Sequence, residues 1–238
     1  MLYVGIDVGH GGGFLREVVL DTETTGLKPE EGHRIIEIGC VELINHLPSG
    51  RQFHSYFNPE REVPSEATAI HGLTWNDLQD QPSFSDGAAE FLGFLGSDKL
   101  VIHNAEFDLR FINTELALIN LPIIAPDRAI DTVGLARRKF PGAPASLDAL
   151  CKRFSIDNSM RDKHGALLDA DLLAQVYVEL IDARQPALGL TADNRDSGTS
   201  LVPPPRTHRA SRKHSASEDE IKKHRMLVSK LHKPLWDM

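Results

Sequence analysis

One strand that ends in two carboxylates constrains this chain most. Residues 16–26 read Arg-Glu-Val-Val-Leu-Asp-Thr-Glu-Thr-Thr-Gly, and the apolar run 18–20 predicts a buried strand that stops at the Thr-Thr-Gly turn. Residues two apart on a strand share a face, so Asp21 and Glu23 are expected to point to one place. Converging buried carboxylates repel each other, and a divalent cation offsets that cost. The pattern therefore predicts a metal site, although the same Asp-x-Glu tripeptide is also common on protein surfaces.

Length and composition indicate one catalytic domain with a tail. A chain of 238 residues can bury a core of ordinary size and still carry appendages. It contains no apolar run of roughly eighteen residues, and its start has no basic region that leads into an apolar one. We therefore expect no membrane span, no secretory signal and a cytoplasmic location. Cys40 and Cys151 lie in apolar patterns, which predicts reduced core residues without chemistry.

The net charge of −8 is unevenly distributed along the chain. Residues 182–238 contain 11 Lys or Arg against 7 Asp or Glu, so the tail is mildly basic and the rest carries the acidic excess. An acidic body argues against tight binding to a long stretch of duplex, which depends on neutralising phosphates. It is compatible with a site that meets a few nucleotides through metal ions.

The first half of the chain predicts strands followed by helices. Residues 1–13 end in Gly-His-Gly-Gly-Gly and predict a flexible leader. Residues 35–44 and 52–57 alternate as strands, joined by a Pro-Ser-Gly turn at 48–50. Together with the first strand they predict a three-stranded start of a sheet. A short helical stretch opens at Pro64-Ser65-Glu66 and ends at His71-Gly72, and residues 84–95 repeat apolar residues at helical spacing.

The second half predicts two more strands and several helices. Residues 100–102 form a short apolar strand, and Asn104 is expected to cap a helix from Ala105 to Ile119. Residues 129–131 predict the next strand. Helices are expected near residues 132–140 and 146–154, separated by Pro-Gly-Ala-Pro.

The helical pattern over residues 166–182 contains an inward-facing acid. Asp169 lies on the same stripe as Leu173 and Val176, whereas Asp171 is expected to face solvent. A carboxylate at an inward position needs a cation or hydrogen-bond donors, so Asp169 joins the predicted metal site. His164 precedes Asp169 by five residues, a spacing that places it on the loop before the helix, free to reach the site.

Three distant segments share this chemistry: Asp21-x-Glu23, His-Asn-Ala-Glu-Phe-Asp at 103–108, and His164 with Asp169. In these motifs the chain resembles the DEDDh exonucleases, and among them the proofreading epsilon subunits of bacterial DNA polymerase III. The resemblance covers roughly residues 16–182 and includes further matching motifs at 32–39, 70–72, 140–142 and 146–151. It implies an α/β, RNase H-like fold with a mixed five-stranded sheet flanked by helices, an exonuclease domain over residues 14–182, and a largely disordered C-terminal tail.

The resemblance also implies two-metal hydrolysis of a phosphodiester. Mg²⁺ or Mn²⁺ suits a site built from oxygen ligands, with two ions per site. Carried over by motif, Asp21 bridges both ions, Glu23 and Asp169 complete the first ion's site, and Asp108 supports the second. His164 is the general base, since imidazole titrates near neutral pH.

Several side chains are expected to contact the terminal nucleotide of the substrate. The catalytic residues Asp21, Glu23, His164 and Asp169 are among them. Glu66 and His71 match family positions that touch this nucleotide, and Phe107 could stack on bases of any kind. The alternatives are an acid at a helix start, a turn histidine and a core aromatic residue.

The C-terminal region is expected to bind partners. Residues 183–217 lack an apolar period and predict a flexible linker. Within it, residues 185–190 resemble a sliding-clamp-binding peptide. Residues 218–238 begin like a capped helix and end near Trp236, and they resemble the tail that docks on the polymerase III alpha subunit. A small accessory subunit is a further expected partner.

Three functions follow from these observations. The first is a 3′–5′ proofreading exonuclease that acts on single-stranded or frayed 3′ DNA ends. The second is a stand-alone DEDDh exonuclease that trims RNA or short oligonucleotides, and the tail argues against it because a free enzyme would not need these peptides. The third is a scaffold with an inactive nuclease, which the complete set of catalytic residues disfavours.

Overall fold

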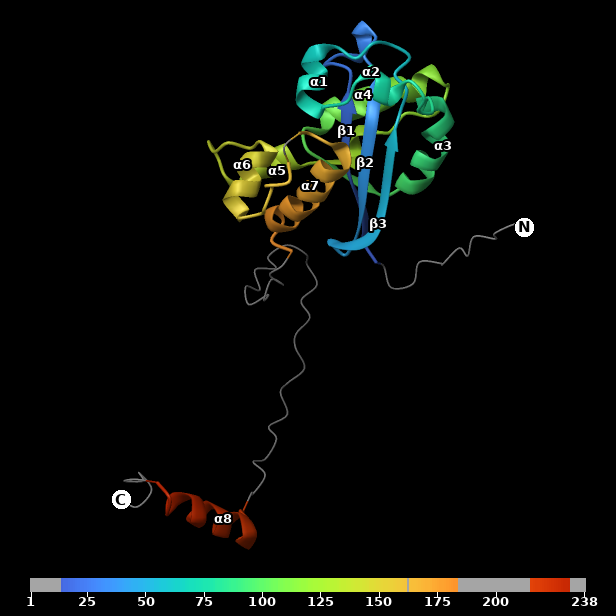
Figure 1. The fold of residues 1–238 in the computed structure, drawn as a ribbon. Coiled ribbons are helices and arrows are strands. Elements are labelled where there is room, and N and C mark those ends of the chain that lie inside the picture. The colour runs from blue at the N-terminus through green and yellow to red at the C-terminus, as the bar shows by residue number, and fades with distance from the viewer. Residues whose placement is uncertain (1–13, 162, 184–214, 232–238) are drawn as a thin grey trace, which may run out of the picture. The chain divides into compact units, whose positions relative to one another are not determined.

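The computed structural model describes residues 14–161, 163–183 and 215–231 (Figure 1). The chain divides into two compact units, residues 1–188 and 189–238, which are described separately. The predicted leader, the peptide 185–190 and Trp236 lie outside the described residues, and so does most of the predicted linker.

The first unit is built on a mixed five-stranded sheet with the strand order β3-β2-β1-β4-β5. The central strand β1 pairs antiparallel with β2 and parallel with β4. The outer strands continue this pattern, because β3 is antiparallel to β2 and β5 is parallel to β4. The fold predicted from the sequence is confirmed. The strands are β1 Arg16–Thr24, β2 Ile35–Ile44, β3 Leu47–Tyr56, β4 Lys99–Ile102 and β5 Ala129–Asp131.

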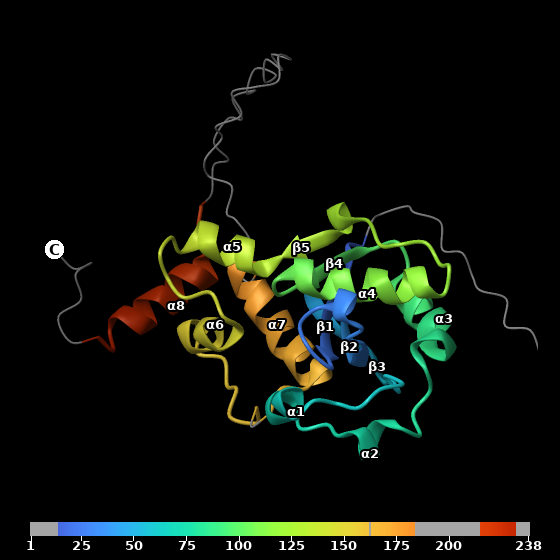
Figure 2. The same ribbon diagram turned by 90° about the horizontal axis from the view of Figure 1, so that it is seen from above.

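Helices cover both faces of the sheet (Figure 2). Alternation along β1 sends Val18 and Leu20 into a core with α3 and α4, and Val19 into a second core with α6 and α7. The short helix predicted between Pro64 and Gly72 and the helix predicted at 84–95 are confirmed as α1 and α3. The helices of this unit are α1 Ser65–His71, α2 Trp75–Leu78, α3 Phe84–Leu95, α4 Ala105–Leu118, α5 Thr132–Lys139, α6 Leu147–Phe154 and α7 Ala166–Leu180, with 3-10 turns at Pro29–Glu31 and Pro126–Arg128.

The predicted turn at residues 48–50 is wrong. The hairpin between β2 and β3 turns at Asn45 and His46, whose φ values of 51° and 65° suit a tight two-residue turn. Residues 48–50 instead continue β3, where Pro48 pairs with Leu43. Because β3 is an edge strand, a proline without an N–H is tolerated there.

The predicted side-chain cap of α4 is also wrong. Asn104 occupies the position before α4 in a left-handed conformation, and its side chain makes no capping bond. The carboxylate of Asp131, at the end of β5, accepts hydrogen bonds from the backbone nitrogens of Asn104 (3.0 Å) and Ala105 (3.4 Å). It also accepts from Val133 and Gly134, so one acid caps the starts of α4 and α5.

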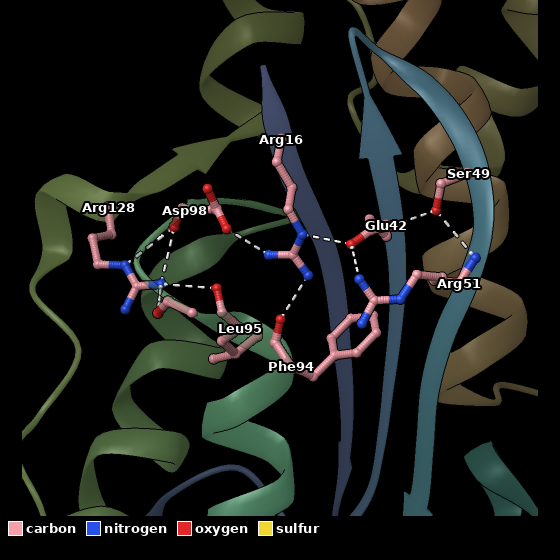
Figure 3. Close-up of polar contacts among 9 residues, drawn as sticks. Arg16, Glu42, Ser49, Arg51, Phe94, Leu95, Asp98 and Arg128 are labelled. Carbon is pink, nitrogen blue, oxygen red and sulfur yellow. Dashed lines mark hydrogen bonds and ion pairs between the residues drawn. The ribbon is translucent and has the colours of Figure 1, made fainter. Parts of the chain in front are cut away.

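A cluster of charged side chains fixes the start of β1 against its neighbours (Figure 3). Arg16 donates to Glu42 on β2 and to Asp98 before β4, both at 2.5 Å. Arg51 and Ser49 on β3 also donate to Glu42, at 2.9 and 2.6 Å. Glu42 is only 3% exposed, so these donors replace the water that burial removes.

The second unit contributes one described helix, α8 Glu218–Val228. Ser217 and Glu220 form the capping box that its sequence predicts. No residue of α8 is buried, and Ile221, Leu227 and Leu231 expose apolar surface. Cys40 and Cys151 in the first unit are buried and free, as predicted. None of the described helices is long and apolar enough to cross a membrane.

Candidate active site

A cavity of about 930 Å³ opens where β1 ends and α4 and α7 begin. All of the candidate site residues named from the sequence line it. They come from β1, α1, α4, α7 and the loop before α7, which lie far apart in the chain. They are Asp21, Glu23, Glu66, His71, Phe107, Asp108, His164 and Asp169.

A glycine on β2 lets α7 approach the sheet at this point. Asp21 lies opposite Gly39 in the antiparallel register. A Cβ at Gly39 would lie 2.3 Å from the backbone of Ala166 and Leu167, so a side chain does not fit where α7 begins. This close approach brings Asp169, in the first turn of α7, to the end of β1, where it is buried as the helical stripe predicts.

In the described part of the chain, Glu23, His164 and Asp169 form a group of side chains that could hold a metal ion. Each offers one ligand atom, and these atoms lie within 4.8 Å of one another. Asp21 and Asp108 line the same cavity but do not belong to this group. His164 lies on the loop before α7, as expected, and its backbone nitrogen donates to the Ile70 carbonyl at 3.2 Å.

The carboxylates of the cavity repel one another, and this repulsion adds to burial in raising their pKa values. Burial, together with repulsion from Asp108, Glu23 and Asp169, raises the pKa of Asp21 well above its usual range. Burial and the charges of Asp169, Glu37 and Asp108 raise the pKa of Glu23 to about 8. A divalent cation offsets the cost of burying these charges and reduces the repulsion between them, and carboxylate oxygens are its preferred ligands. The residues present therefore fit a site for a divalent metal ion.

Asp108 reaches the cavity from the first turn of α4. Thr22 on β1 donates a buried hydrogen bond of 2.7 Å from Oγ1 to Asp108 Oδ1. Burial raises the pKa of Asp108 to about 7, and the bonds from Thr22 and the backbone oppose that rise. Thr22 thus holds this carboxylate in place, a role that its sequence context does not suggest.

Arg161 also lines the cavity, and the sequence analysis did not identify it as a site residue. Its guanidinium donates to both oxygens of Asp169, from Nε at 2.5 Å and from Nη2 at 2.6 Å. Nη1 donates to Asp148 at 2.6 Å, and Nη2 lies 3.0 Å from His164 Nδ1. The buried Asp169 therefore has the cationic partner that burial requires.

His71 lines the cavity and has one ring nitrogen without a hydrogen-bond partner. Its Nδ1 accepts from the backbone nitrogen of Leu73 at 3.0 Å. Because Nδ1 accepts this bond, it carries no proton and the N–H of the ring is on Nε2; burial also lowers the pKa of His71. Among the described residues, this Nε2 is the one buried side-chain nitrogen or oxygen without a hydrogen-bond partner.

The other two predicted nucleotide contacts differ in burial. Glu66 is exposed near the start of α1 and lines the cavity. Phe107 is half-buried, packs against Phe111 with ring centroids 5.0 Å apart, and also lines the cavity. It is therefore partly a core residue, and the part that faces the cavity is available for stacking.

Comparison with known proteins gives consistent results. A family model described as an exonuclease matches residues 18–177. DNA polymerase III subunit epsilon of Rickettsia felis is 46% identical over 223 residues, covering 91% of this chain and 97% of that protein. The solved structure of Exonuclease X in complex with 5′ overhanging duplex DNA is 30% identical with a TM-score of 0.57, covering 70% of this chain and 91% of that chain.

A further likeness concerns the fold alone. The nuclease domain of 3′hExo, a DEDDh family member bound to rAMP, has a TM-score of 0.61 at 21% identity, covering 73% of this chain and 94% of that one. Fold, cavity and family model together define the class of DEDDh exonucleases, which confirms the class predicted from the sequence. The chain belongs to the exonuclease family, in the group of the DNA polymerase III epsilon subunits.

Proposed function

We propose that this chain is the proofreading 3′–5′ exonuclease of a bacterial replicative DNA polymerase and removes mispaired nucleotides from primer ends. The observation that carries the proposal is the convergence of four acids and a histidine on one cavity. The relationship to the epsilon subunits supports DNA as the substrate. The acidic body is consistent with a site that grips only the last few nucleotides.

The acids would hold two ions, Mg²⁺ or Mn²⁺. Asp21 would bridge both, Glu23 and Asp169 would complete the site of one, and Asp108, oriented by Thr22, would support the other. When bound, such ions activate water and stabilise negative charge on the phosphate and on the leaving 3′ oxygen. The raised pKa values of Glu23 and Asp108 support this assignment, because burial disfavours the charged form of both carboxylates and a bound cation would offset that cost.

His164 would act as the general base. Its side chain is 47% exposed, so it can exchange a proton with solvent, and its Nδ1 lies 3.3 Å from Asp169 Oδ2. An imidazole at this position can take a proton from the attacking water and release it after the reaction. Its place on a loop leaves it able to adjust to the substrate.

The terminal nucleotide would bind against α1 and α4. The Nε2–H of His71 would donate to an acceptor of the nucleotide, which would satisfy its missing hydrogen bond. Glu66 would contact the sugar or base at the cavity rim, and Phe107 would stack on a base. Stacking on Phe107 does not distinguish one base from another, which suits an enzyme that removes any mispaired nucleotide.

The tail would tether the nuclease to the replication machinery in the cytoplasm. Residues 185–190 would bind the sliding clamp, and residues 218–238 would bind the polymerase alpha subunit. The helix α8 has no buried residue and exposes the apolar Ile221 and Leu227, which supports a partner surface in the second segment. A tether of this kind raises the local concentration of nuclease without a rigid interface. A small accessory subunit would bind the exonuclease domain.

One experiment separates the proposal from the stand-alone alternative. The full chain is given a primer with a 3′ mismatch, a matched primer and an RNA oligomer, each with Mg²⁺ or with EDTA. We expect metal-dependent removal of the mismatched end before the matched end and slow attack on RNA. Equal or faster degradation of RNA would identify a trimming enzyme instead. A truncation after Asp182 should keep this activity and lose binding to the polymerase subunit.

A further inference from the structure

In this structure the guanidinium of Arg161 is bonded to Asp169, a carboxylate that is expected to bind metal. Its side chain is 7% exposed, and its fork spans both oxygens of Asp169. Both Arg161 and Asp169 line the cavity. A paired guanidinium of this kind forms strong, directional hydrogen bonds to a carboxylate.

The same oxygens are the ones that a metal ion would use. Asp169 is only 3% exposed, and both of its oxygens accept hydrogen bonds from Arg161. The neighbouring ligand atoms of Glu23 and His164 lie within 4.8 Å, and Nη2 of Arg161 is 3.0 Å from His164 Nδ1. A guanidinium at this position and an ion held by the same three side chains would compete for charge and for space.

A second acid offers the arginine another place. Asp148, near the start of α6, accepts from Nη1 of Arg161 at 2.6 Å and from Asn158 at 3.1 Å. Its side chain is 61% exposed and lies outside the tight group of metal ligands. Arg161 can therefore release Asp169 and keep the bond to Asp148, while its freed nitrogens still face the cavity.

We propose that Arg161 is a positioning residue that exchanges with a divalent cation at Asp169. Before metal binds, it neutralises Asp169 and keeps the site assembled. When metal binds, Arg161 releases Asp169 and keeps its bond to Asp148, so that its freed nitrogens can meet the phosphate of the substrate. The inference rests on the proposed function, since it takes Asp169 to be a metal ligand.

The experiment measures Mn²⁺ affinity of the full chain by calorimetry without nucleotide. Arg161→Gln removes the competitor, so affinity should rise about tenfold or more, the change expected when a hydrogen bond to a charged group is removed. Arg161→Lys keeps the charge but not the fork and should fall between Arg161→Gln and the unaltered chain. The melting temperature in EDTA should fall in Arg161→Gln, and the rise caused by Mn²⁺ should grow.

Two matched variants control for fold and for charge. Arg34 also forks onto a buried acid, Glu115, with both bonds at 2.8 Å, but it does not line the cavity. Arg34→Gln should lower stability and leave Mn²⁺ affinity unchanged. Lys163 is exposed, two residues from Arg161, and bonds to the Ala69 carbonyl, so Lys163→Gln removes nearby charge without touching Asp169.

The outcome is decided by the comparison of these variants. A gain in affinity for Arg161→Gln that is much larger than for Lys163→Gln supports exchange. An equal gain, or an unchanged or weakened affinity, overturns it. Nuclease activity of the unaltered chain is measured in parallel, so that active protein with an unchanged Arg161→Gln affinity rejects the exchange alone and leaves the proposed function standing.

Discussion

Asp21 on β1 lies opposite Gly39 on β2, at the point where the backbone of α7 meets the sheet. The first acid of the site and the helix that carries the last acid are thus positioned by one residue without a side chain. The arrangement of the cavity depends on this contact as much as on the acids themselves.

Gly39→Ala should therefore damage both stability and activity. The added Cβ would lie 2.3 Å from the backbone of Ala166, so α7 must move. Overpacking of this kind costs about 1–3 kcal/mol, and the displacement of Asp169 should lower the cleavage rate further. Urea unfolding and primer degradation measure the two effects. Gly93→Ala in α3, where a Cβ meets nothing within 4 Å, is the matched control and should cause neither loss.

Stability in EDTA should fall as pH rises through the range in which Glu23 ionises. The pKa of Glu23 is raised to about 8 in the folded protein, whereas the pKa of an unfolded Glu is roughly 4.3. The contribution of Glu23 to the free energy of unfolding is therefore fully present below the unfolded pKa and is lost as pH rises through 8. Glu23→Gln should be more stable than the unaltered chain at pH 9 and gain little at pH 5. Urea unfolding at both pH values tests this, and a parallel pH dependence of the two proteins would contradict it.

His164→Ala should reduce turnover much more than binding. A general base contributes roughly 10²–10⁴-fold to the rate and acts only in the transition state. Single-turnover cleavage and the affinity for a single-stranded oligonucleotide would be measured across pH. We expect the variant to lose the limb of the pH profile that reports the base. A variant that keeps both its rate and that limb would show that another group accepts the proton.

The cluster around Arg16 should matter for stability and not for chemistry. Arg16→Met leaves the buried Glu42 with only its β3 partners, and loss of a partner of a buried ion costs about 3 kcal/mol. The cluster does not line the cavity, so the cleavage rate well below the melting temperature should be unchanged. A large fall in rate with intact stability would show that the start of β1 is coupled to the site.

Regular spacing explains which parts of the site could be predicted. Asp21 and Glu23 follow the two-residue period of a strand, and Asp169 follows the apolar stripe of a helix, so local pattern alone orients all three. An inward-facing Asp169 also predicts a cation or hydrogen-bond donors beside it. This is the one feature of the sequence that indicates a partner such as Arg161. Nothing in its loop, rich in Asp, Asn and Ser, says which residue supplies them.

Contacts between distant segments account for what local pattern missed. Thr22 bonds to Asp108 across 86 residues, and Asp131 caps a helix that begins 26 residues earlier. The hairpin turn was misplaced for a related reason. Pro-Ser-Gly is a strong turn signal, but the edge position of β3 removes the cost of placing it in a strand.

The most direct test of the central claim is the activity of Asp21→Ala with Mg²⁺ or Mn²⁺ on a primer with a 3′ mismatch. Loss of this carboxylate removes a metal ligand. It also removes a buried acid that neighbouring acids repel, as the raised pKa of Asp21 indicates. We predict a folded protein, at least as stable as the unaltered chain in EDTA, with essentially no turnover. A folded Asp21→Ala protein that degrades the primer at the normal rate would contradict the assignment of this cavity as a metal-dependent nuclease site.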